Sequence, residues 1–89
     1  MKHYNIRIYG RVQRVGFRYW TLRTADNLGI KGFVKNLADG SVYIEAEGDQ
    51  EQLSEFLIWC RKGADYSNVE EVDVEEASVQ NFTSFYVRH

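Results

Sequence analysis

The sequence predicts an α+β fold in which two helices pack on one face of an antiparallel sheet. Two segments have the residue spacing of amphipathic helices, and they are separated by segments in which apolar and polar residues alternate. The chain has 89 residues, which is enough for a single domain, residues 1–89, and too few for a second. Hydrophobic residues make up 44% of the chain, so one core can be filled efficiently.

The first half of the chain predicts a strand, a helix and a hairpin. Apolar residues alternate with polar ones from Tyr4 to Tyr9, as in a half-buried strand. From Phe17 to Leu28 they recur at helical spacing, and Gly29 follows where a left-handed helix cap is expected. The short extended segment Gly32–Asn36 and the strand Val42–Ala46 flank Asp39-Gly40, a pair typical of a two-residue hairpin turn.

The second half predicts a helix followed by two strands. Asp49 is a suitable N-cap for a helix that Gly63 ends, and its apolar face consists of Leu53, Phe56, Leu57 and Cys60. A half-buried strand is expected from about Val69 to Ala77. A short final strand is suggested by Phe82, Phe85 and Val87.

This order of elements, βαββαβ plus a short C-terminal strand, is typical of the ferredoxin-like sandwich. Right-handed crossovers would pair the first strand with the third and the fourth. The loop after the first strand and the Asn36 end of the second strand would then lie near one another.

Charge is distributed unevenly along the chain. Residues 1–37 contain eight Lys or Arg residues and a single acid, Asp26, whereas residues 38–89 contain three Lys or Arg and twelve Asp or Glu. The acidic second half argues against a large nucleic-acid interface, which needs a domain-wide basic surface. The alternative to a functional basic region is a chance clustering of charges on two surface faces.

The sequence also bears on compartment and cofactors. Cys60 is the only cysteine, so no intrachain disulfide can form, and a reducing compartment is expected. We find no signal-peptide pattern and no apolar run long enough to cross a membrane, so we expect a cytoplasmic monomer without membrane contact. No spacing of His, Cys and carboxylates suggests a metal site, and we expect no cofactor.

The most informative segment is Gly10-Arg-Val-Gln-Arg-Val-Gly-Phe-Arg18. It leaves a strand, crosses a short loop and enters a helix. Such a loop presents unpaired backbone N–H groups and the positive end of the helix dipole, and a phosphate or another oxyanion fits it. Arg18 can grip two phosphate oxygens, although it can also be an ordinary exposed arginine. Asn36 can orient a water without ionising, although an isolated Asn at a strand end is more often a turn residue.

Taken together, the segments 10–18, Gly32-Phe-Val-Lys-Asn36 and Asp39-Gly40-Ser41-Val42 resemble the acylphosphatase family. The resemblance spans nearly the whole chain, and the two motifs at this separation are highly specific. It implies metal-independent hydrolysis of small acyl phosphates, which are carboxyl-phosphate mixed anhydrides, to a carboxylate and inorganic phosphate. It also implies that Arg18 binds the phosphoryl group and that Asn36 positions the attacking water. The phosphate-binding loop would comprise Gln13, Arg14, Val15, Gly16, Phe17 and Arg18.

The chain departs from the family pattern at Arg14, where glycine is usual. If this position requires a positive φ, a side chain there costs on the order of 1 kcal/mol. One alternative function is therefore a phosphate-binding or acyl-phosphate-binding module with impaired turnover. A second alternative is a ferredoxin-like RNA-binding domain that stacks bases on Tyr9 and Tyr43. Cys60 as a nucleophile is a weaker hypothesis than Cys60 as a small core residue.

Overall fold

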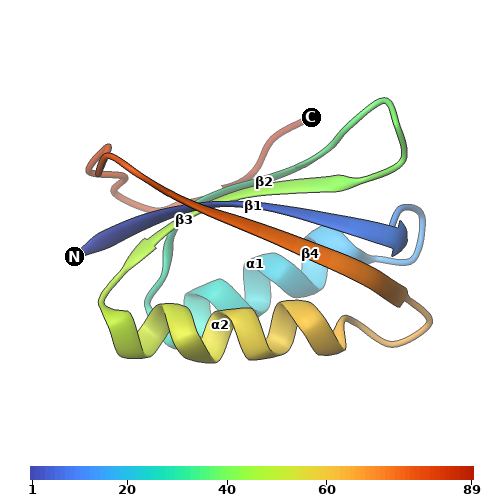
Figure 1. Cartoon of the computed structure of the whole chain (residues 1–89), viewed down its shortest axis with the longest axis horizontal. Coiled ribbons are helices and arrows are strands. Elements are labelled where there is room, and N and C mark those ends of the chain that lie inside the picture. Colours follow the sequence, from blue (N-terminus) through green and yellow to red (C-terminus); the bar gives the residue numbers. More distant parts are fainter.

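A five-stranded sheet covered on one face by two helices forms the structure, a computed structural model that describes Met1–His89 (Figure 1). The elements in chain order are β1 (Lys2–Arg11), α1 (Phe17–Leu28), β2 (Lys31–Asn36), β3 (Val42–Gly48), α2 (Gln50–Lys62), β4 (Asn68–Ala77) and β5 (Phe85–Val87). The predicted α+β order is confirmed. Neither α1 nor α2 has the length and apolar character that a membrane-spanning helix needs.

The strands are arranged in the order β4-β1-β3-β2-β5. β1 pairs antiparallel with both β3 and β4, as the crossover argument predicted, and Ile6 lies opposite Ile44 on one side and Val74 on the other. β5 pairs with β2 in parallel, so the sheet is mixed at this edge. Because β3 runs antiparallel to both β1 and β2, the C-terminal ends of β1 and β2 lie at the same end of the sheet.

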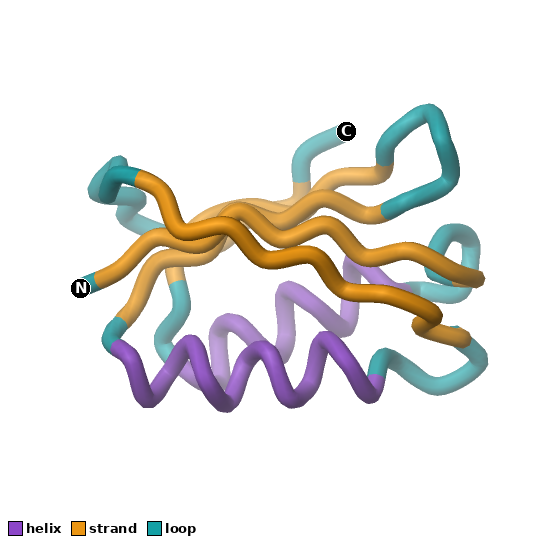
Figure 2. Tube along the Cα trace, in the orientation of Figure 1, coloured by secondary structure: helices purple, strands orange, loops and turns teal.

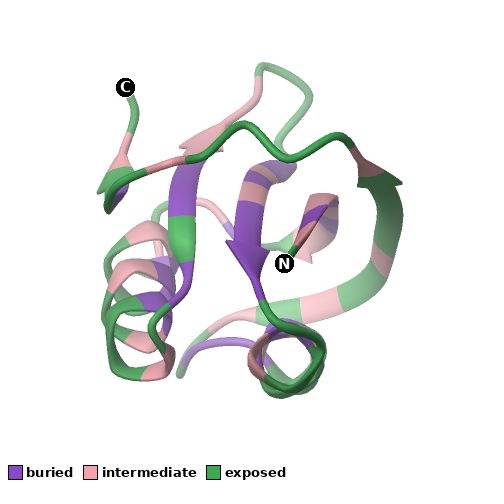
Figure 3. Cartoon of the chain, turned by 90° about the vertical axis from the view of Figure 1, so that its left-hand side faces the viewer, coloured by how far each residue is buried: buried purple, intermediate pink, exposed green.

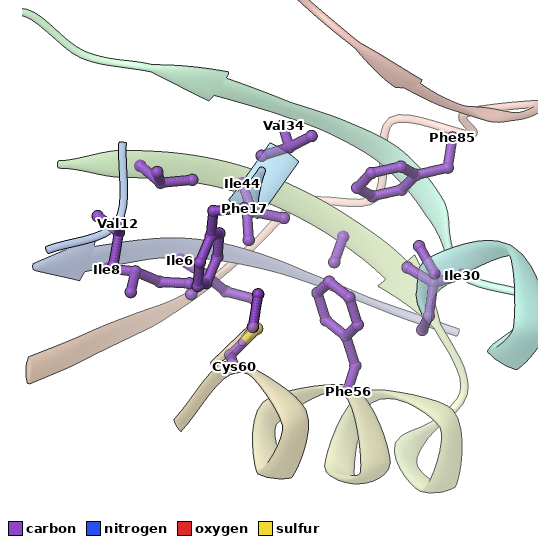
Figure 4. Close-up of a cluster of buried hydrophobic side chains, with 14 of the residues drawn as sticks. Ile6, Ile8, Val12, Phe17, Ile30, Val34, Ile44, Phe56, Cys60 and Phe85 are labelled. Carbon is purple, nitrogen blue, oxygen red and sulfur yellow. The ribbon is translucent and has the colours of Figure 1, made fainter. Parts of the chain in front are cut away.

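The core lies between the sheet and the two helices, which run along a single face (Figure 2). Strand side chains that point to this face are buried, and the outer surface of α2 is exposed (Figure 3). The close-up in Figure 4 shows Phe17 from α1 and Phe56 and Cys60 from α2 facing the aliphatic residues of the strands. Each fully buried side chain of this kind contributes about 1.5–3 kcal/mol to folding.

Both helices end where the sequence indicated. Gly29 adopts φ 76° and its N–H bonds to the carbonyls of the last turn of α1, as a left-handed cap requires. Asp49 caps α2: its carboxylate accepts from the Gln52 N–H at 2.8 Å, while the Gln52 side chain accepts from the Asp49 N–H. The cap residue Gly63 follows Lys62.

Two local expectations were wrong. The turn between β2 and β3 spans residues 37–41 and is not a two-residue hairpin, because it is closed by a bond from the Leu37 N–H to the Ser41 carbonyl at 2.9 Å. Within it, the Asp39 carboxylate accepts from the Ser41 N–H at 2.9 Å. Phe82 lies outside the final strand, which begins at Phe85. Its ring packs instead on the open face of the sheet, beside Phe33 and His3.

A buried ionic cluster fastens the segment before β5 to the sheet. His3 on β1 and Glu47 on β3 are each 1% exposed, and His3 Nδ1 lies 2.6 Å from Glu47 Oε2. The Glu47 carboxylate also accepts from the N–H groups of Gln80 and Phe82. Burial would lower the pKa of His3, but hydrogen bonds to Glu47 and Asn5 and nearby carboxylate charges raise it. Burial would raise the pKa of Glu47, but its hydrogen bonds lower it.

These shifts predict a pH window for the stability that the cluster provides. The contribution of His3 is complete below its unfolded pKa of 6.5 and is lost as the pH rises through the raised folded value. The contribution of Glu47 is complete above 4.5 and is lost as the pH falls through the lowered folded value. The cluster therefore stabilises the fold most between these two values.

Urea unfolding of the wild type and of His3→Gln checks this prediction. We expect the wild type to exceed the variant by about 2 kcal/mol at pH about 5.5, and by less at pH about 8.5. His89→Gln, which removes the other histidine, serves as the control. A difference between the wild type and His3→Gln that does not change with pH would contradict the prediction.

Candidate functional site

The loop after β1 and the end of β2 border one open hollow of about 350 Å³. The C-terminal ends of β1 and β2 lie on the same side of the sheet in Figure 1. The polar residues that line the hollow are Arg14, Arg18, Asn36 and His89, and Gly16 contributes backbone only. Its apolar residues are Val12, Phe17, Tyr19, Leu22 and Val87. The hollow is therefore lined partly by cationic and polar residues and partly by apolar ones.

The loop backbone has the conformation of an anion cradle. At Gly10, where φ is 125°, the register of β1 against β4 shifts, and a Cβ there would lie 2.1 Å from the carbonyl oxygen of Asn68. Arg14 and Gly16 then adopt positive φ values of 63° and 76°. The N–H groups of residues 14–16 donate to no backbone carbonyl. Free N–H groups in such a turn, followed by a helix N-terminus, form a concave anion-binding surface.

Arg18 lies in the first turn of α1 and borders the cradle. Its side chain is partly buried, and its Nη1 atom lies 3.3 Å from Nδ1 of His89. The first turn of α1 contains no acidic residue, so nothing in the helix neutralises this cation against the positive end of the dipole. A guanidinium in this unfavourable position is well placed to bind an anion.

Asn36 is the last residue of β2 and lies opposite Val42 of β3. Its Oδ1 atom is buried and is the one buried side-chain polar atom without a hydrogen-bond partner. Leaving a buried acceptor unpaired costs about 1–3 kcal/mol. Asn36 also lines the cationic hollow, so its amide group can contact a water or substrate bound there.

The electrostatics of the hollow favour anions. No Asp or Glu lines it, whereas Arg14 and Arg18 both do. Within the chain, no group of three or more His, Cys, Asp or Glu residues is arranged to hold a metal ion. The charge of an anion bound here would be balanced by guanidinium groups and backbone N–H dipoles.

The structure brings together most of the residues predicted for the site. Arg14, Gly16, Phe17, Arg18 and Asn36 all line the hollow. The other two loop residues point elsewhere: Val15 packs against the core, and the Gln13 amide donates to the carbonyls of Leu37 and Ser41.

His89 also lines the hollow, and the sequence analysis assigned it no role. No local signal could have found it, because it reaches Arg18 across 71 positions of sequence. Cys60 lies away from the hollow and is fully buried, and burial raises the pKa of its thiol. This environment suits a core residue and not a nucleophile.

Comparison with known proteins agrees with this geometry. The family model of the acylphosphatases matches residues 4–87. The chain belongs to the acylphosphatase family. An acylphosphatase of Thermotoga maritima is 46% identical over 89 residues, which cover 100% of this chain and 99% of the relative. One of Archaeoglobus fulgidus is 48% identical over 84 residues, which cover 94% of each chain.

A solved structure extends the comparison to the fold. The crystal structure of the acylphosphatase of Bacillus subtilis superposes on this chain with a TM-score of 0.98 at 38% identity, covering all of both chains. The two-helix, five-strand arrangement is therefore an acylphosphatase fold of the ferredoxin-like type. The family membership identifies the chain as an acylphosphatase enzyme.

The positive φ of Arg14 predicts that this acylphosphatase gains stability when the side chain is removed. We expect Arg14→Gly to raise the free energy of unfolding by about 1 kcal/mol, because glycine adopts the left-handed region without strain. Thermal melting measures the change. Arg14→Ala keeps the Cβ and removes the charge, so it separates backbone strain from electrostatics. An unchanged melting temperature for Arg14→Gly would contradict the expected strain.

Proposed function

We propose that this acylphosphatase hydrolyses small acyl phosphates to a carboxylate and inorganic phosphate, with Arg18 and Asn36 as its catalytic residues. The observation that carries the proposal is that Asn36, at the end of β2, and Arg18, in the first turn of α1, line the same hollow. The Asn36 amide can form a hydrogen bond with a water, and the Arg18 guanidinium supplies a fork of donors for phosphoryl oxygens.

In the proposed complex, the phosphoryl group occupies the loop of residues 13–18. Backbone N–H groups and Arg18 bind its nonbridging oxygens, and the charge of Arg14 adds to the attraction. A loose phosphoryl-transfer transition state spreads charge over these oxygens. Preorganised donors stabilise such charge without having to reorganise during the reaction. The loop would therefore act both in binding and in lowering the barrier.

Asn36 would hold the attacking water through a hydrogen bond to its side-chain amide. The water oxygen forms a bond to phosphorus while the bond from phosphorus to the acyl oxygen breaks, and a carboxylate leaves. The proton lost by the water passes to a phosphate oxygen of the substrate. A carboxylate is a good leaving group, so correct placement of the water is the main requirement. The scheme needs no general base.

The same proposal covers partners, compartment and organisation. We propose that residues 1–89 act as one domain, that the enzyme is a cytoplasmic monomer, and that it uses no metal or other cofactor. Its partners would be the acyl phosphate and inorganic phosphate, without nucleic acid or membrane. Arg14 and Arg18 are the cations assigned to the task that a metal ion performs in other phosphoryl-transfer enzymes.

The two alternatives receive less support. For RNA binding, Tyr9 and Tyr43 do border a common hollow on the open face of the sheet, but Asp73 and Glu75 border it as well. These carboxylates would repel a phosphate backbone. For a binding module without turnover, the positive φ of Arg14 is the only motivating feature.

The first test is release of phosphate from benzoyl or acetyl phosphate by the purified protein in the presence of a chelator. We expect sustained turnover, because the charge on the phosphoryl group is met by arginine and backbone donors. Phosphate binding without turnover would favour the inactive module, and activity that appears only on adding a divalent metal would contradict the proposed metal independence.

Two alanine substitutions separate the proposed roles. Arg18→Ala should weaken inhibition by inorganic phosphate and lower kcat, because it removes a charged contact worth about 1.5–3 kcal/mol. Asn36→Ala should lower kcat by about 100-fold and leave inhibition by phosphate nearly unchanged. Steady-state kinetics with phosphate as the competitor measure both effects. Full kcat in Asn36→Ala would refute the role of Asn36 in placing the water.

A further inference from the structure

The Gln13 side chain connects the two halves of the site. Its amide nitrogen donates to the carbonyl of Leu37 at 2.8 Å and to the carbonyl of Ser41 at 2.9 Å. A primary amide has two N–H hydrogens, so both are used. Gln13 thus spans from the cradle loop to the turn between β2 and β3.

The two acceptors are the closing residues of that turn. Leu37 N–H donates to the Ser41 carbonyl at 2.9 Å, and Gly40 N–H donates to the Leu37 carbonyl at 3.2 Å. Gln13 adds a second donor to each of these carbonyls. Leu37 directly follows Asn36, so the amide of Gln13 holds the backbone one residue beyond the proposed water-positioning side chain.

The two sides of this bridge are anchored unequally. The cradle is fixed at both ends, by β1 and by α1, with Val12 and Phe17 each 1% exposed. The turn beyond Asn36 is exposed from Ala38 to Gly40, and apart from Gln13 it is held by β2 and β3. Loss of the bridge would therefore displace the Asn36 side more than the cradle.

We propose that Gln13 is a positioning residue whose side-chain amide sets the location of Asn36 relative to the phosphate cradle. The inference rests on the function proposed above. It gives the Gln13 side chain a role distinct from that of the loop backbone. Gln13 acts through the turn, and the phosphate itself is bound by its neighbours.

The test uses Gln13→Met, which has a similar volume and no donor. We expect kcat to fall about 10-fold or more, because a displacement on the order of 1 Å in a catalytic group can cost about 100-fold. The inhibition constant for inorganic phosphate should stay within about twofold of the wild type, since the cradle keeps both anchors. If Gln13 contributed only to stability, its loss would not lower kcat while leaving the inhibition constant for phosphate unchanged.

Gln52→Ala is the matched control. The Gln52 amide also donates to a backbone carbonyl 24 residues away, that of Leu28 at 2.9 Å, but at the other end of α1. We expect this variant to melt at a lower temperature with an unchanged kcat. An equal fall in kcat for Gln52→Ala would assign the effect of Gln13→Met to general stability and overturn the proposal.

A double-mutant cycle identifies the residue through which Gln13 acts. Once Asn36→Ala has removed the positioned group, adding Gln13→Met should lower kcat by less than about twofold. Fully multiplicative losses, or a kcat for Gln13→Met within twofold of the wild type, would overturn the proposal. If Gln13→Met does not fold, Gln13→Asn, which has a shorter reach, must show the same selective loss of kcat. An inactive wild-type protein would instead refute the proposed function.

Discussion

The position of β3 between β1 and β2 is the constraint on which the rest of the site depends. Since β3 is antiparallel to both neighbours, β1 and β2 run in the same direction and end at the same edge of the sheet. Two strand spacings, about 10 Å, separate them. The cradle and Asn36 therefore face each other across a fixed gap, although they are far apart in the sequence. The hydrophobic core beneath holds this geometry by burying the paired strands together with both helices.

Local signals in the sequence were sufficient for most of the fold. Glycine caps, the N-cap at Asp49 and the alternation of apolar residues each reflect a preference of a few adjacent residues, and the structure follows them. The order of elements then restricted the topology, because crossover handedness leaves few ways to pair the strands. The same reasoning placed Arg18 and Asn36 near one hollow, as the structure shows.

The features that escaped prediction depend on contacts between distant residues. The turn after Asn36 accepts a hydrogen bond from Gln13, which lies 24 residues before Leu37. The His3–Glu47 pair joins residues 44 positions apart, and the contact of His89 with Arg18 spans 71. The backbone conformation at Arg14 was also beyond what the residue type alone predicts. Its left-handed conformation was inferred only conditionally, from a comparison with the usual glycine, because arginine has no preference for this region.

The acidic second half of the chain has a structural consequence at the edge of the sheet. β4 is an edge strand, and Glu70, Glu71, Asp73, Glu75 and Glu76 along it are all exposed. Close spacing of carboxylates even raises the pKa of Glu71, through a hydrogen bond and the charge of Asp73. An unpaired strand edge is a template for joining other chains into aggregates, and a row of like charges opposes that association. The acids that repel anions are thus kept out of the hollow and placed where they help to keep separate molecules apart.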